Sequence, residues 1–190
     1  MADSRRASII PGVRKLALLA CAAIAAAAIA GTAGAAATNG TLSVEQGKGT
    51  VTIEIRGSVL GRLANGTVRV TDLTPRDRFY PVVLGRKLII TRSGPKTITY
   101  KGQSLRFRML GGRSKIVVKG SGISVSAVGR GFVTLDGDRR FPDDDAGFYS
   151  LDGTDCSYDV ALCTPLPDLP ERYVIGPPPA TPASRGSSSR

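Results

Sequence analysis

The chain has 190 residues and a formal net charge of +11, and 42% of its residues are hydrophobic. This length allows one ordinary domain beside a targeting segment. The absence of histidine excludes Ser-His-Asp hydrolysis, Cys-His transpeptidation and His-ligated zinc chemistry. No other group of residues is typical of an active site, so we expect a protein that is not an enzyme, with no catalytic residue and no cofactor.

The first 37 residues have the pattern of an export signal. Arg14 and Lys15 precede an uncharged, alanine-rich segment at 16–37 that ends in small residues suited to signal peptidase. This predicts a signal helix, or an uncleaved membrane anchor, since about 20 apolar residues suffice to span a bilayer. A lipobox-like sequence ends at Cys21, but lipidation there would leave the apolar run on the mature chain. We expect a secreted or otherwise extracytoplasmic protein, which is retained at the membrane if the segment is not cut.

Residues 38–136 are expected to form a basic β-strand domain. Apolar and polar residues alternate in short runs separated by glycine, which is the pattern of half-buried strands. Val51, Ile53 and Ile55 would share one face of a strand, and the dipeptide Asn65-Gly66 predicts a two-residue hairpin turn. Apart from the leader, no segment has the periodicity of a helix.

Three segments share the order strand, glycine turn, strand, at 41–55, 87–100 and 115–128. Their starts are unevenly spaced, which favours repeated hairpins over a regular repeat. The predicted fold is therefore all-β, an antiparallel β-sandwich or roll built from repeated hairpins. A short β-solenoid is the alternative, and it would require turns of nearly equal length.

The charge divides sharply along the chain. From Lys48 to Arg130 there are 17 lysine and arginine residues against 3 acidic ones, and from Gly131 to Glu171 there are 2 against 10. We expect residues 137–175 to be an acidic loop region packed on the domain, and residues 176–190 to be a disordered proline-, serine- and alanine-rich tail. Within the acidic region, Cys156 and Cys163 are expected to form a disulfide, because an exported mature chain would hold these two cysteines in an oxidising compartment.

A basic strand face is the strongest functional hint. It comprises Arg106, Arg108, Arg113, Lys115 and Lys119, which lie on adjoining predicted strands and are expected to point the same way. Outside a membrane, such a surface would bind an anionic cell-wall polymer or a membrane surface through salt-sensitive contacts. Aromatic residues are too few to stack bases, so sequence-specific nucleic-acid binding is not expected.

Two other hypotheses remain open. The basic residues could simply keep strand edges soluble and meet the acidic region, which would leave a structural module with a protein partner. The acidic region also offers weak calcium candidates, although their spacing matches no defined calcium loop, and carboxylate-dependent carbohydrate chemistry is more distant still. The calcium candidates are Asp136, Asp138, Asp143, Asp144 and Asp145.

Overall fold

The computed structural model describes residues 40–74, 81–141 and 143–176, except for the side chains of Asp143 and Asp144. The chain divides into two compact units, residues 1–34 and 35–190, and the first lies wholly outside the described part. The predicted signal or anchor helix and the predicted tail beyond Gly176 also lie outside it. Within the described residues, no helix is long and apolar enough to cross a membrane.

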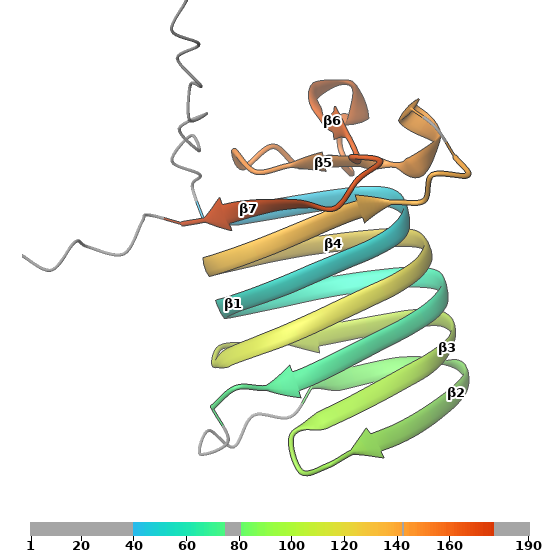
Figure 1. The fold of residues 1–190 in the computed structure, drawn as a ribbon, viewed down its shortest axis with the longest axis vertical. Coiled ribbons are helices and arrows are strands. Elements are labelled where there is room, and N and C mark those ends of the chain that lie inside the picture. Colours follow the sequence, from blue (N-terminus) through green and yellow to red (C-terminus); the bar gives the residue numbers. More distant parts are fainter. Residues whose placement is uncertain (1–39, 75–80, 142, 177–190) are drawn as a thin grey trace, which may run out of the picture. The chain divides into compact units, whose positions relative to one another are not determined.

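The described part is predominantly antiparallel β-structure, which confirms the predicted all-β class (Figure 1). Its main sheet has the strand order β2-β3-β1-β4-β7, and β5 pairs with β1 and β6. The elements are β1 (Thr41–Asp72), β2 (Val82–Ser93), β3 (Thr97–Met109), β4 (Arg113–Gly137), the 3-10 helix η1 (Asp143–Ala146), β5 (Phe148–Ser150), the 3-10 helix η2 (Val160–Leu162), β6 (Thr164–Pro165) and β7 (Glu171–Ile175).

The two longest strands wind around a common core. β1 pairs with β4 in two registers, so Val51 lies opposite both Val118 and Leu135, and Val118 lies opposite both Val51 and Val68. Each strand therefore meets itself again 17 residues later, with one strand of the returning chain between. In Figure 1 the ribbons of β1 and β4 alternate in the stack and bend round at one side to run back behind it. Strands β1 to β4 thus form one long hairpin, which reverses at the β2–β3 turn and coils on itself.

Glycines build the two corners of this coil. One column aligns Gly49, Gly66, Gly102, Gly120 and Gly137 across neighbouring strands. A Cβ at Gly120 would lie 2.0 Å from the Asn65 carbonyl oxygen, so no larger residue fits without moving backbone. The second column aligns Gly40, Gly57, Gly112 and Gly129, where the Gly57 and Gly129 amides donate to the carbonyls of Gly112 and Gly40.

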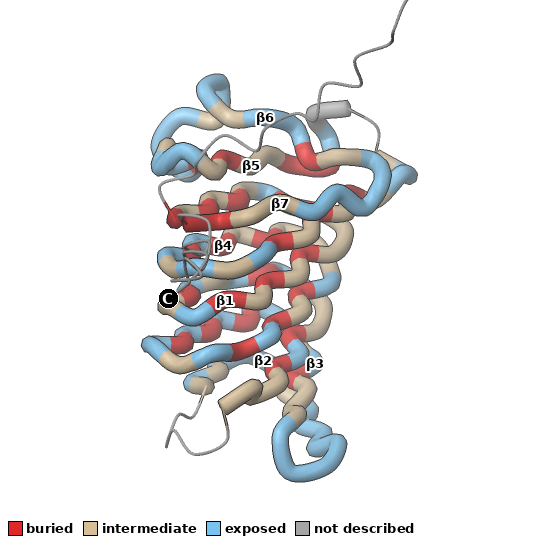
Figure 2. The backbone as a smooth tube through the Cα atoms, turned by 60° about the vertical axis from the view of Figure 1, so that its left-hand side comes forward, coloured by how far each residue is buried: buried red, intermediate tan, exposed pale blue. Residues whose placement is uncertain are grey.

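The corners divide the coil into two layers. Layer A comprises 50–56, 67–72, 89–93, 97–101, 113–119, 130–136 and 171–175, and layer B comprises 41–45, 58–63, 82–84, 105–109, 123–128 and 148–150. Alternate residues of both layers point inward into one hydrophobic cluster, so buried and exposed positions alternate along the chain (Figure 2). The remaining positions form two separate outer faces, one on each layer.

The prediction that the fold consists of repeated hairpins was wrong. Of the three similar segments, only 87–100 is a hairpin, whereas 41–55 and 115–128 are bends within β1 and β4. Asn65-Gly66 is likewise a corner of β1, because its geometry turns the strand around the coil and does not reverse it. The equal turns resemble the solenoid alternative, but neighbouring strands are antiparallel.

The acidic region covers the end of the coil away from β2. β5 pairs with β1 at Ser43–Glu45, and β7 pairs with β4 at Gly131–Leu135. Ala146 and Leu166 are buried against the core from this region. At the other end, no strand of the described residues pairs with the outer edge of β2.

Candidate anion-binding surface

The five cations predicted to share a face lie on two faces. Lys115 and Lys119 point outward from layer A, and Arg113 lies at the edge of that layer beside the second glycine corner. Arg106 and Arg108 point outward from layer B. The second glycine corner, at Gly112, lies between Arg108 and Arg113, so the structure brings together only the three residues of β4.

An arginine ladder crosses three neighbouring strands at the edge of layer A. Arg56 of β1 lies directly opposite both Arg113 and Arg130 of β4. Neighbouring strands are about 4.8 Å apart, and all three side chains are exposed. Like charges placed directly opposite each other destabilise a sheet. The repulsion between these three arginines is therefore unfavourable for folding.

Four further cations extend the ladder across the outer face of layer A. Lys101 and Lys119 flank Thr67 on its two neighbouring strands, and Arg69 lies two residues along β1 from that threonine. Lys115 lies opposite Glu54 and Thr71. We call these four and the ladder the basic layer, which comprises Arg56, Arg69, Lys101, Arg113, Lys115, Lys119 and Arg130.

The basic layer has few internal anions. Glu54 accepts from Arg113 at 3.5 Å, and this is the only ion pair within the basic layer among the described residues. Asp136 lies at the end of the same face, opposite Thr50. Between the cations the outer face carries many half-buried threonines, so it offers hydroxyl groups as well as charge. The threonines are Thr50, Thr52, Thr67, Thr71, Thr97, Thr99 and Thr134.

No family model, curated protein or solved structure matches this chain.

The outer face of layer B carries charged side chains and two grooves. Arg62 lies directly opposite Arg106, and Arg62 donates to Glu45 at 3.2 Å. The Ser124 hydroxyl also donates to Glu45, at 2.8 Å. Hollows of about 560 and 470 Å³ lie against these residues, beneath the acidic region.

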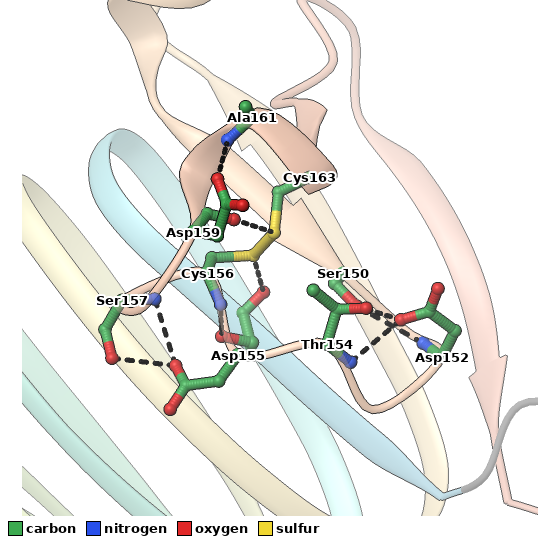
Figure 3. The surroundings of a disulfide bond; sticks show 10 residues. Ser150, Asp152, Thr154, Asp155, Cys156, Ser157, Asp159, Ala161 and Cys163 are labelled. Carbon is green, nitrogen blue, oxygen red and sulfur yellow. Dashed lines mark hydrogen bonds between the residues drawn. A yellow bond between two sulfur atoms is a disulfide. The ribbon is translucent and has the colours of Figure 1, made fainter.

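The carboxylates of the acidic region are mostly engaged in local turns. The side-chain hydrogen bond from Arg140 lowers the pKa of Asp138 to about 2. Around the disulfide, Asp152 accepts from Ser150 and Thr154, and these bonds lower its pKa to about 2 (Figure 3). The hydroxyl and amide of Ser157 lower the pKa of Asp155 in the same way.

The predicted disulfide between Cys156 and Cys163 is present, with Cα atoms 5.9 Å apart (Figure 3). Cys156 is buried, and its amide donates to the Ser43 hydroxyl at 3.1 Å, which ties the loop to the first strand. A disulfide is compatible with an extracellular location.

The calcium candidates do not form a binding cluster in the described part of the chain, where no three acidic, histidine or cysteine side chains lie close enough to hold a metal ion. Asp138 is directed to Arg140, and Asp136 lies on layer A opposite Thr50. Asp145 lines the larger groove of layer B. The side chains of Asp143 and Asp144 lie outside the described part.

Sequence reasoning missed Arg56, Arg69, Lys101 and Arg130. A signal for two of them was present, because Gly112-Arg113 and Gly129-Arg130 repeat the same dipeptide 17 residues apart, and Arg56 precedes Gly57. Except for Gly102, the glycines of each corner column also recur 17 residues apart, and this period would have identified the coil and aligned these arginines.

Proposed function

We propose that the protein is exported and binds an anionic polymer of the cell envelope through the basic layer. The observation that carries this proposal is the arginine ladder, in which Arg56 lies opposite Arg113 and Arg130. Within the described residues, Glu54 is the one carboxylate paired to it, through Arg113. A bound polyanion relieves the repulsion between the three guanidinium groups and makes charge-assisted, bidentate hydrogen bonds to them.

The shape of the surface supports a linear polymer over a small ligand. The cations lie on an outer strand face and cross five neighbouring strand segments of layer A, so a chain of phosphates or carboxylates can contact them in succession. The threonine hydroxyls between them can donate to the same anionic groups. Export is supported by the leader pattern and by the Cys156–Cys163 disulfide.

Replacement of the ladder tests the proposal. In the full chain, the double variant Arg56→Gln with Arg130→Gln removes two cations that have no ion pair among the described residues. We expect its affinity for poly(glycerol phosphate) or polygalacturonate to fall by about tenfold or more, since hydrogen bonds to charged groups contribute about 1.5–3 kcal/mol each. The matched control, Arg86→Gln with Arg108→Gln, removes the same charge away from the basic layer and should bind nearly as the parent does. Equal losses in both variants would show that net charge, and not the ladder, governs binding.

The exposed edge of β2 favours a second candidate, a surface for a protein partner. Val82, Leu84, Ile89 and Ile90 are all about half exposed or more on this strand. An unpaired strand edge with apolar residues can accept an additional strand. Cross-linking the full chain to its neighbours in intact envelopes, with and without Ile89→Lys, tests this candidate, because a protein partner at the edge would lose its cross-link in the variant.

A further inference from the structure

A groove of about 560 Å³ follows the first glycine corner on the layer B side. Its floor is made of small residues from neighbouring strands, and a Cβ at Gly122 would lie 2.9 Å from the Cβ of Ala64. Ser104 continues the lining on β3, while Asp145 and Gly147 of the acidic region close the groove at the covered end of the coil. The groove exists because the side chains in this row of the face are small.

One wall of the groove carries two opposed cations. Arg62 and Arg106 lie directly opposite each other on β1 and β3. Arg62 is neutralised by Glu45, but Arg106 has no ion pair among the described residues. Since directly opposed like charges are unfavourable in a sheet, this wall is suited to one further anionic group placed between the two guanidinium groups.

The other polar residues of the lining limit which kind of anionic ligand can bind in the groove. Glu45 and Asp145 line the groove together with three cations, Arg62, Arg106 and Lys48, and the Lys48 ammonium also lies 4.0 Å from the centre of the Phe141 ring. Three cations against two carboxylates leave a net charge of +1, which suits a singly charged carboxylate better than a doubly charged phosphate. The same carboxylates can accept hydrogen bonds from hydroxyl groups. The Ser104 hydroxyl can donate or accept, whereas the Ser124 hydroxyl, which donates to Glu45, can accept. A planar carboxylate also matches the fork of an arginine side chain.

We propose that this groove is a second ligand site, which binds a hydroxylated carboxylate of the size of a single sugar acid. The carboxylate lies between Arg62 and Arg106, and the hydroxyl groups face Glu45, Ser104 and Ser124. The site lies on layer B and shares no residue with the basic layer, so it does not depend on the proposed polymer binding.

Titration of the full chain with sodium glucuronate, followed by the amide resonances of Ala64 and Gly122, tests the site. Glucose, acetate and inorganic phosphate are the comparison ligands, because they supply the hydroxyls alone, the carboxylate alone and a different anion. We expect glucuronate to give saturable shifts at both amides and to bind about tenfold or more tightly than each comparison ligand.

Three variants connect the binding to the groove. Arg106→Gln removes the unpaired cation and should weaken glucuronate binding about tenfold or more, and Ala64→Gln should block the floor without changing charge. Arg108→Gln is the matched control, since it removes the same charge two residues along β3 and does not line the groove. The proposal is overturned if glucuronate gives no saturable shift, if inorganic phosphate or acetate binds equally well, or if Arg108→Gln weakens binding as much as Arg106→Gln does.

Discussion

Substituting the corner glycine Gly120 with alanine tests the coiled architecture most sharply. Gly120 has a φ of 153° and pairs with Gly49 on one side and Gly66 on the other. An alanine Cβ would lie 2.0 Å from the Asn65 carbonyl oxygen and 2.9 Å from the Gly66 Cα. Both neighbours are backbone atoms within paired strands, so the clash can be relieved only by separating β4 from β1.

The cost can be estimated from the two effects. An alanine at positive φ costs about 1–2 kcal/mol, and loss of one or two ladder hydrogen bonds adds about 0.5–1.5 kcal/mol each. Gly120→Ala should therefore lower the free energy of unfolding by about 3 kcal/mol. Gly94→Ala is the matched control, because Gly94 has a φ of 70° at the β2–β3 turn and a Cβ there meets nothing within 4 Å. Its strain is partly offset by the lower entropy of the unfolded chain, which leaves a cost of about 1 kcal/mol or less.

Urea denaturation of both full-length variants, followed by far-ultraviolet circular dichroism, measures the difference. The chain has no tryptophan, so the backbone signal is the suitable probe. If Gly120→Ala costs no more than Gly94→Ala, the close approach of β4 and β1 at this corner is refuted, and with it the stacked glycine column.

Other properties follow from the same structure. Ile53→Ala should destabilise the protein by about 2–5 kcal/mol in the same assay, because Ile53 is fully buried and lies between two β4 segments; a loss below about 1 kcal/mol would contradict its place in the core. Replacing Cys156 and Cys163 together by serine should cost about 2.5 kcal/mol by the chain-entropy estimate for so short a loop, whereas an unchanged urea midpoint would show that the disulfide does not constrain the fold. The pKa values of Asp138 and Asp152 lie at about 2 and below the ordinary 3.8, so their contribution to stability is present above pH 4 and is lost as the pH falls toward 2. Asp138→Asn should reduce the steepness of that loss, and an identical acid denaturation curve would argue against the Arg140 bond.

Strand content and the inward faces could be predicted from the sequence. The alternation placed Val51, Ile53 and Ile55 together, and all three are buried. Leu105, Phe107 and Met109 alternate with polar residues in the same way along β3, and they are buried too. Local alternation suffices here because the side chains of a strand point in turn to opposite faces.

The coil itself could not be predicted from local patterns. A turn signal such as Asn65-Gly66 fixes a positive φ, but whether the chain then reverses or bends around a corner depends on its pairing with distant strands, at Gln103 and Ser121. The prediction that the five basic residues share one face was wrong for the same reason. Arg106 and Lys119 each alternate correctly on their own strands, yet a corner lies between them, and only the long-range register reveals it.

The salt dependence of polymer binding tests the central claim most directly. The affinity of the full chain for poly(glycerol phosphate), measured across a salt series, should fall linearly on a log-log plot. Arg56→Gln with Arg130→Gln should reduce the slope by about two, one for each lost contact, and Arg86→Gln with Arg108→Gln should leave it unchanged. Binding that is absent at low salt, or a slope that the ladder variant does not alter, would contradict the basic layer as the binding surface.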